Sequence, residues 1–210
     1  MQISESDIFS FINQKNIPYL KKYSDYLNII IKYNSELNLF SRTINKEQLI
    51  IDHFYDCVDG FNYFESYNTI ADLGSGGGFP GILLAITFPY KKVLLIEKSA
   101  KKCEYLLKVI KELSLVNVSI INKVLENNHL SEVDVVTCRA FKPIDIILEL
   151  TENYYKEYKK YILYKGKLET ISTELQRAEK KLKISIENKY KTEKICLLNK
   201  EKERHLVFIN

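Results

Sequence analysis

The residues with the clearest chemical meaning form a glycine loop, residues 72–81 (DLGSGGGFPG). The loop follows a short apolar run and leads into an apolar helical pattern over residues 81–88. Glycines let a strand turn sharply and let a ligand approach the backbone closely. Because a helix starts directly after the loop, its free N–H groups are expected to face the same space. The loop therefore predicts a ligand-binding site.

Two classes of ligand fit this loop. The spacing Gly76-x-Gly78-x-x-Gly81 matches the dinucleotide fingerprint, and Glu97 follows about 20 residues later, where an acidic side chain binds ribose hydroxyls. Asp72 favours the other class, since a carboxylate ahead of the first glycine suits a ligand with a cationic end and repels a pyrophosphate. The methionine ammonium of S-adenosylmethionine is such an end, and we predict this cofactor, with no metal. Its expected site comprises Asp72, Gly74, Gly76, Gly78 and Glu97. A dinucleotide site and a glycine turn without a ligand are the alternatives.

The elements around the loop predict an α/β fold. Strand and helix patterns alternate from residue 69 to residue 165, which indicates parallel βαβ units with right-handed crossovers. Two final strands, 193–198 and 205–209, are joined by a short link and must pair antiparallel. The prediction is a class I (Rossmann-like) methyltransferase fold: a mostly parallel seven-stranded sheet with an antiparallel last strand, plus N-terminal helices. The expected strands cover 69–74, 93–97, 118–122, 133–138, 161–164, 193–198 and 205–209, and the expected helices 18–39, 45–63, 81–88, 100–113, 144–160 and 168–183. We expect residues 1–67 to form a helical extension and residues 68–210 the methyltransferase domain.

Composition limits the class of protein. The 210 residues are 46% hydrophobic and 28% charged, which excludes a disordered or fibrous chain. No apolar stretch approaches the roughly 20 residues that cross a membrane, the N-terminus lacks the features of a signal peptide, and the four cysteines have no metal-ligand spacing. A cytoplasmic protein without a membrane partner is expected. Residues 151–210 carry 15 basic and 9 acidic side chains, which indicates either an anionic partner or simply a lysine-rich chain.

Six separated motifs together resemble one family. They are NLFS (38–41), HFYDC (53–57), GSGGGFPGILLAI (74–86), CRA (138–140), KG (165–166) and ERHLV (203–207). Their order and spacing, from about residue 30 onward, resemble the RsmG family, also called glucose-inhibited division protein B. The resemblance implies methylation of N7 of a guanine in bacterial 16S ribosomal RNA, with this RNA or the small ribosomal subunit as partner. We expect the protein to act as a monomer.

The resemblance also implies particular cofactor contacts. By position they fall on Gly74, Phe79, Val124, Leu125 and Arg139. The sequence departs from the family at Leu125, where an acidic residue is usual and here Glu126 stands one position later. A contact through backbone groups tolerates this change, whereas a contact through a carboxylate requires Glu126 to shift by one position.

Basic residues supply the remaining candidates. Arg139, at the end of a strand, is expected to bind the cofactor carboxylate or a phosphate, and its alternative is a structural ion pair with Asp72 or Asp134. We assign catalytic roles to Arg139 and Arg204. Candidate contacts to RNA, which would make binding salt-dependent, are Arg42, Lys123, Lys165, Arg204 and His205. Their alternative is an ordinary solvated surface.

Three further features weigh on the reaction. Cys138 ends a strand where a covalent nucleophile would stand, but a small buried apolar residue is the expected role. The segment CRAFKP (138–143) lacks the N-P-P-Y pattern of amino-group methyltransferases. His53 lies on an apolar helix face and is expected to be a core histidine, with Asp56 as a possible partner. The rival functions are a small-molecule methyltransferase and a dinucleotide-binding sensor.

Overall fold

The strand order defines the architecture of this computed structural model, which describes residues 2–12, 19–123, 130–157, 159–187, 189–195 and 202–210. These residues form a seven-stranded sheet in the order β3-β2-β1-β4-β5-β7-β6. Neighbouring strands from β3 to β5 run parallel, and β7 pairs antiparallel with both β5 and β6. The strands are β1 (Thr69–Leu73), β2 (Lys92–Ile96), β3 (Val118–Ile121), β4 (Val135–Arg139), β5 (Lys160–Lys165), β6 (Tyr190–Lys194) and β7 (His205–Ile209). The predicted sheet, with its antiparallel last strand, is confirmed.

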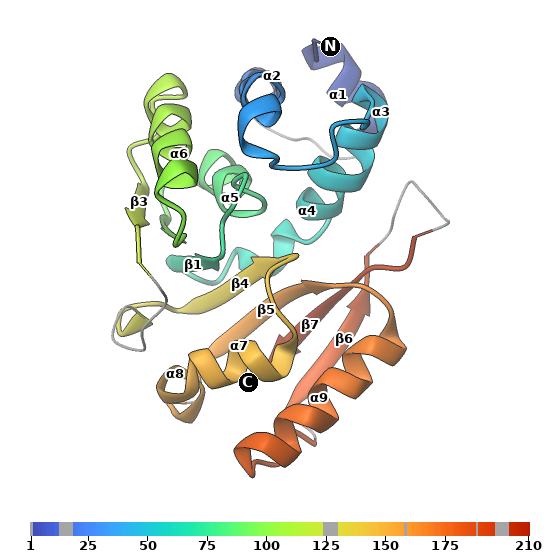
Figure 1. The fold of residues 1–210 in the computed structure, drawn as a ribbon, viewed down its shortest axis with the longest axis vertical. Coiled ribbons are helices and arrows are strands. Elements are labelled where there is room, and N and C mark those ends of the chain that lie inside the picture. The colour runs from blue at the N-terminus through green and yellow to red at the C-terminus, as the bar shows by residue number, and fades with distance from the viewer. Residues whose placement is uncertain (1, 13–18, 124–129, 158, 188, 196–201) are drawn as a thin grey trace.

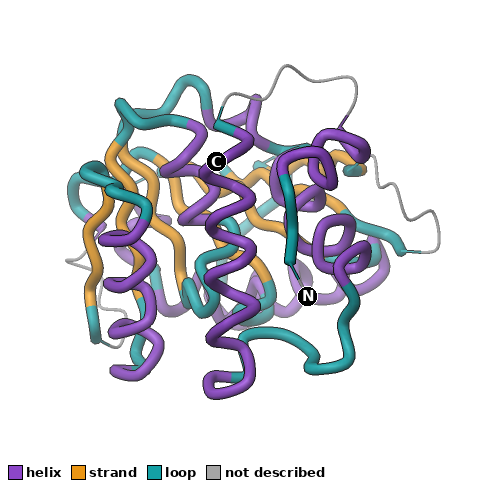
Figure 2. The backbone as a smooth tube through the Cα atoms, turned by 90° about the horizontal axis from the view of Figure 1, so that it is seen from above, coloured by secondary structure: helices purple, strands orange, loops and turns teal. Residues whose placement is uncertain are grey.

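Helices cover both faces of this sheet (Figure 1). On one face lie α5 (Gly81–Thr87) and α6 (Ala100–Glu112) together with the N-terminal helices. On the other lie α7 (Ile144–Leu150), α8 (Glu152–Lys156) and α9 (Leu168–Leu182). The view from above shows helices on both sides of the strands (Figure 2). Each face has its own buried apolar cluster, as a sheet sandwiched between two helical layers requires.

The N-terminal helices share one apolar core with the sheet. They are α1 (Glu5–Ile12), α2 (Leu20–Leu37), α3 (Lys46–Leu49), the π-helix η1 (Ile50–Tyr55), α4 (Asp56–Val58) and the 3₁₀ helix η2 (Phe61–Phe64). Tyr26, Leu27 and Ile30 of α2 are fully buried in the same cluster as Leu83 of α5 and Leu106 of α6. Packing of an apolar stripe, rather than helix propensity, holds such helices in place. The division between residues 1–67 and 68–210 stays a prediction.

Three elements differ from their predicted extent. The helix predicted over 144–160 is two helices, because the Thr151 hydroxyl donates to the carbonyl oxygen of Ile147 and pairs with the Tyr161 hydroxyl. The helix predicted over 45–63 changes to π geometry at Ile50–Tyr55 and ends at Val58, and a separate 3₁₀ helix follows at Phe61–Phe64. The strand predicted over 193–198 starts earlier, at Tyr190, and residues 196–198 lie outside the described residues.

Candidate functional site

The order of the strands places a crevice at the ends of β1 and β4. From β1 the chain winds outward through β2 and β3, and then returns to the other side of β1 as β4. In open parallel sheets, ligands bind at this reversal, outside the carboxyl ends of the strands. The glycine loop follows β1 and the CRAFKP segment ends β4, so the fold brings the two most informative motifs together.

Contact between the glycine loop and Phe141 shows how closely they meet. Gly74 has a φ of +66°, and a Cβ built there would lie 2.2 Å from Cδ2 of Phe141. Gly78, at φ +96°, leaves room for the Tyr26 hydroxyl and Ile82. Both positions therefore need glycine for conformation and for space. The Phe141 ring forms the boundary between the loop and the pocket beyond it.

Asp72 lies beneath the loop and has no exposed surface. Its Oδ2 accepts a hydrogen bond of 3.1 Å from the Gly81 N–H, whereas none of the described residues donates a hydrogen bond to its buried Oδ1. Burial raises the pKa of this carboxyl to about 7. A buried acceptor without a donor fits a cationic group brought by a ligand, so this part of the site fits the methionine end of S-adenosylmethionine.

Glu97 follows β2 and faces the same loop. Its two carboxylate oxygens accept hydrogen bonds from the Gly76 N–H at 3.0 Å and the Ser99 N–H at 2.8 Å. A carboxylate oxygen can accept a second bond, so Glu97 can hold the loop and still accept from ribose hydroxyls.

The N-terminal and α6 helices support the loop from behind. The hydroxyls of Tyr26 and Tyr105 both donate to the carbonyl oxygen of Gly77, at 2.6 and 3.2 Å. Phe79 is buried, with its ring 5.4 Å from that of Tyr26 and 5.7 Å from that of His53. The loop is thus fixed both by α2, which precedes the sheet in the sequence, and by α6, which follows β2.

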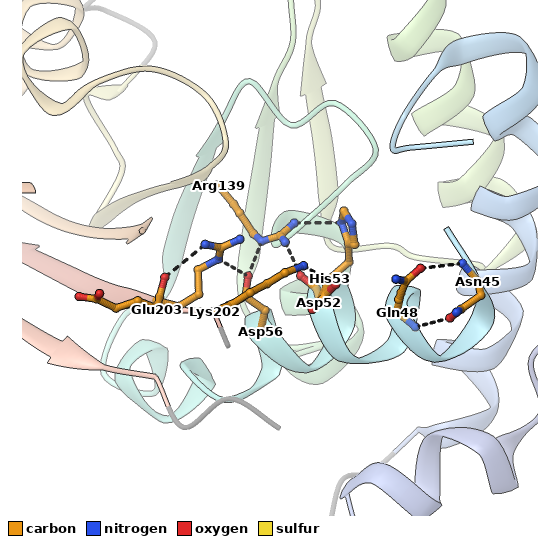
Figure 3. A network of polar contacts seen from close by, with 9 residues as sticks. Asn45, Gln48, Asp52, His53, Asp56, Arg139, Lys202 and Glu203 are labelled. Carbon is orange, nitrogen blue, oxygen red and sulfur yellow. Dashed lines mark hydrogen bonds and ion pairs between the residues drawn. The ribbon is translucent and has the colours of Figure 1, made fainter. Parts of the chain in front are cut away.

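Arg139 is the centre of a polar network that joins β4 to the π-helix (Figure 3). Its Nε lies 2.9 Å from Oδ2 of Asp56, its Nη2 donates to the Asp52 carbonyl oxygen at 2.6 Å, and its Nη1 is 3.3 Å from Nδ1 of His53. Arg204 approaches the same Asp56 oxygen at 3.6 Å. Single π-helical turns within α-helices often occur at functional sites. Here the π-helix and the first residue of α4 bring the Asp52 carbonyl, the His53 imidazole and the Asp56 carboxylate to one guanidinium.

This network changes two expectations. The structural ion pair of Arg139 is with Asp56, not with Asp72 or Asp134, because Asp134 instead accepts from the backbone N–H groups of Asn68 and Thr69. The carboxylate of Asp56 faces Arg139 and not His53. Burial and the Arg139 cation lower the pKa of His53 to about 3, so the imidazole is neutral. It packs between the rings of Phe40 and Phe79 but is only half-buried, so it lies at the edge of the core rather than within it.

A pocket of about 350 Å³ opens beside this network, at the ends of β4 and β5. Its lining combines aromatic rings, cations and two carboxylates. The residues are Asp56, Cys138, Arg139, Ala140, Phe141, Lys142, Pro143, Tyr164, Lys165, Gly166, Glu174 and Arg204. Aromatic faces with a few placed polar groups are what a nucleobase pocket requires.

The predicted RNA contacts are placed unequally. Arg204 is half-buried at the pocket, Lys123 is exposed, and Arg42 is exposed with its guanidinium bonded to Asn38 and the Ser35 carbonyl oxygen. Lys165, with a side chain only 12% exposed, is tied to Glu174 and to the Lys142 carbonyl oxygen. His205 is buried, with Nδ1 2.8 Å from the Gly166 carbonyl oxygen. Lys165 lines the pocket with its ammonium already paired, and His205 is buried outside the lining, next to Gly166. Neither is well placed to contact a phosphate.

Cys138 lines the pocket but is buried, and burial raises the pKa of its thiol to about 12. The thiolate is the nucleophilic form, so this environment suits a small apolar residue rather than a covalent catalyst. Val124 and Leu125 lie outside the described residues. Among the part of the chain that is described, no group of three or more His, Cys, Asp or Glu is arranged for a metal ion, and no helix is long and apolar enough to cross a membrane.

The sequence alone does not single out several residues that line the pocket or join its network. Glu174 had a detectable signal, since it is a charged residue on the face of a helix that also carries Ile171, Leu175 and Ala178. Phe141 and Lys142 lie in the CRAFKP segment without a distinguishing pattern. The ion pair of Lys202 with Asp52, at 2.5 Å, joins residues 150 positions apart and had no local signal.

Comparisons with known proteins identify the family of this chain. A family model described as "rRNA small subunit methyltransferase G" (GidB) matches residues 19–207. The "Ribosomal RNA small subunit methyltransferase G 1" of Bdellovibrio bacteriovorus is 39% identical over 94% of this chain and 92% of its own. The "Ribosomal RNA small subunit methyltransferase G" of Brachyspira hyodysenteriae is 36% identical over 90% of each chain.

Solved structures support the fold. An O-methyltransferase from Bacillus cereus, in complex with SAH, matches with a TM-score of 0.61 at 12% identity. The match covers 98% of this chain and 96% of that enzyme. A putative O-methyltransferase from Klebsiella pneumoniae has the same TM-score at 11% identity, with the same coverage of both chains. The fold is that of a class I methyltransferase. With the family match over nearly its whole length, the chain belongs to the rRNA small subunit methyltransferase G family.

Proposed function

We propose that this protein transfers a methyl group from S-adenosylmethionine to N7 of a guanine in 16S ribosomal RNA. The observation that carries the proposal is family membership over residues 19–207, with relatives at 36–39% identity named for ribosomal RNA methylation. The site supports it, since a glycine loop suited to the cofactor lies directly beside a pocket suited to a base. S-adenosylhomocysteine is the expected product, and the cytoplasm, where ribosomal subunits are found, is the expected location.

The cofactor supplies a methyl group on a positively charged sulfur. The glycine loop, Asp72 and Glu97 would hold it at the ends of β1 and β2. Guanine N7 has a free lone pair, so the enzyme does not need to remove a proton before transfer. The main contribution of the chain is then to align N7 with the methyl group and to exclude water. The base must leave its stack to enter the pocket.

The cations of the pocket favour RNA over a neutral small molecule. Arg139, Lys142, Lys165 and Arg204 line it. Arg139 and Lys165 are held in ion pairs with carboxylates, whereas Lys142 is exposed and Arg204 is half-buried. Arg139 is held by Asp56 and the π-helix, so we assign it to positioning the cofactor end of the pocket. Arg204, which keeps a third of its side chain exposed, is the better placed of the two to contact a phosphate.

The test uses labelled S-adenosylmethionine and small ribosomal subunits, or their RNA, from cells that lack this protein. We expect label in RNA, and 7-methylguanosine at one position after digestion to nucleosides. Binding and transfer should weaken steeply as salt concentration rises, because phosphate contacts release counterions. Label in another nucleoside, or only in small molecules, would reject the proposed reaction.

A further inference from the structure

The pocket contains a second carboxylate, that of Glu174, besides the Asp56 carboxylate that binds Arg139. Glu174 extends from α9 into the pocket lining with its side chain only 10% exposed. Its Oε2 accepts hydrogen bonds of 2.9 Å from both the Ile144 N–H and the Lys165 ammonium. Among the described residues, none donates a hydrogen bond to Oε1. The carboxylate is therefore fixed at one oxygen and retains acceptor capacity at the other.

A buried carboxylate with a free acceptor has a restricted set of partners. The Glu174 Oε1 atom is not fully enclosed by protein, so it is open to the pocket and can accept hydrogen bonds from a ligand that enters there. Of the four RNA bases, guanine presents two adjacent donors on its Watson–Crick edge, N1–H and the N2 amino group. Adenine presents an acceptor at N1 and would be repelled.

We propose that Glu174 recognises the target guanine by accepting hydrogen bonds from N1–H and the N2 amino group. This inference rests on the proposed function and adds to it the residue that selects the base. Lys165 and the Ile144 N–H fix the orientation of the carboxylate, and the Phe141 and Tyr164 rings at the pocket wall provide surfaces for the purine.

The proposed orientation exposes the correct atom. N7 is on the opposite side of the purine from N1 and N2. A guanine held at Glu174 therefore directs N7 away from α9. Phe141, which lines this pocket, also touches the space above Gly74, so the purine lies next to the cofactor loop.

Glu174 also stabilises the charge that develops during the reaction. The N7 lone pair forms the new N–C bond while the S–C bond breaks and its electron pair stays on sulfur, and no proton is lost. The positive charge passes to the purine, which makes N1–H and the N2 amino group stronger donors. A carboxylate at that edge is then bound more strongly in the transition state than in the ground state, which raises the rate of transfer.

The first test changes the RNA and leaves the protein intact. After the methylated guanine has been located, inosine, which lacks the N2 amino group, is placed at that position in the same RNA. We expect single-turnover transfer by the wild-type protein to fall roughly 10-fold, as for the loss of one hydrogen bond to a charged acceptor. An unchanged rate would overturn the role of Glu174.

The second test changes the protein. Glu174→Gln keeps an oxygen for the Ile144 N–H but removes the charge, and Glu169→Gln makes the same change at an exposed site on the same helix. We expect Glu174→Gln to reduce single-turnover transfer to guanine roughly 10- to 100-fold, to bind S-adenosylhomocysteine normally, and to lose most of the discrimination against inosine. Glu169→Gln should match the wild type.

The outcomes separate the two proposals. If Glu174→Gln matches Glu169→Gln on both RNAs while the wild type makes 7-methylguanosine, the recognition role is wrong and the function stands. If the wild type methylates no RNA guanine, the function is wrong and the recognition role fails with it.

Discussion

At the scale of single residues, Asp72 connects the cofactor site to the pH dependence of stability. Its carboxyl is fully buried and its pKa is raised to about 7, because burial disfavours the charged form. The folded protein therefore holds a proton that the unfolded chain releases at lower pH. The stability from this group is complete below the unfolded pKa of about 4 and is lost as pH rises toward 7.

Asp72→Asn removes this titration while keeping an oxygen for the Gly81 N–H. Without cofactor, we expect the difference in unfolding free energy between variant and wild type to shift by about 2.5 kcal/mol in favour of the variant from pH 5 to pH 8. Binding of S-adenosylhomocysteine should weaken, since the ligand ammonium loses its carboxylate. Thermal melting at both pH values and calorimetric titration measure these effects, and Asp25→Asn, at an exposed pair with Lys21, is the control. A difference that is the same at pH 5 and pH 8 would contradict the buried titration.

Cys138 gives a second prediction at this scale. Because burial holds its thiol in the neutral form, Cys138→Ser should keep close to the wild-type rate of methyl transfer per folded molecule. Transfer is measured with labelled cofactor, and the folded fraction by near-UV circular dichroism. Complete loss of transfer in a folded variant would point to a covalent mechanism.

At the scale of elements, the glycine loop offers a matched pair of substitutions. Gly74 and Gly76 both have positive φ, at +66° and +54°, but only at Gly74 does an added Cβ meet the Phe141 ring. At Gly76 the nearest atom to that Cβ is the Gly74 carbonyl oxygen, at 3.6 Å. Each alanine costs about 1 kcal/mol of backbone strain, and overpacking adds about 1–3 kcal/mol at Gly74 alone.

We therefore expect Gly74→Ala to lower the melting temperature more than Gly76→Ala and to abolish cofactor binding. Phe141→Ala combined with Gly74→Ala should recover part of the lost stability, because the clash is relieved while the strain remains. Melting curves of the wild type, the two single alanine variants and the double variant test this coupling. Equal destabilisation by the two alanines would show that Phe141 does not pack on Gly74.

The elements also show what the sequence can and cannot predict. Buried parallel strands such as β1 and β4 are mostly apolar, so the sequence predicts their positions closely. The edge strand β6 has the largely polar sequence YKTEK. Because the apolar residues come after it, the sequence pattern predicts a strand over 193–198 instead. The glycine loop was predictable because its chemistry is local. The network around Arg139 was not, because its partners depend on a π-turn and on side chains more than 80 positions away.

At the scale of the whole molecule, the N-terminal helices help to hold the glycine loop of the proposed cofactor site. Tyr26, on α2, donates its hydroxyl to the Gly77 carbonyl oxygen at 2.6 Å in a fully buried position. We expect Tyr26→Phe to reduce the unfolding free energy by about 1 kcal/mol and to weaken binding of S-adenosylhomocysteine, because the loop loses a hydrogen bond that orients it.

The control is Tyr33→Phe on the same helix, since no hydrogen bond of the Tyr33 hydroxyl is found among the described residues and its ring packs at 5.5 Å from that of Tyr105. Chemical denaturation and calorimetry measure both effects. Normal cofactor affinity in Tyr26→Phe would mean that the N-terminal helices pack beside the loop without positioning it.

The shared acceptor at Gly77 has a consequence for how such genes can recombine. Tyr26 and Tyr105 lie on opposite sides of residue 67 but bond to the same carbonyl oxygen. A crossover between two relatives near that residue would pair the helices of one ancestor with the glycine loop of another. Recombinants should bind the cofactor with full affinity only where the parent of the helices also places a hydroxyl at that oxygen, so the two halves are expected to be inherited together.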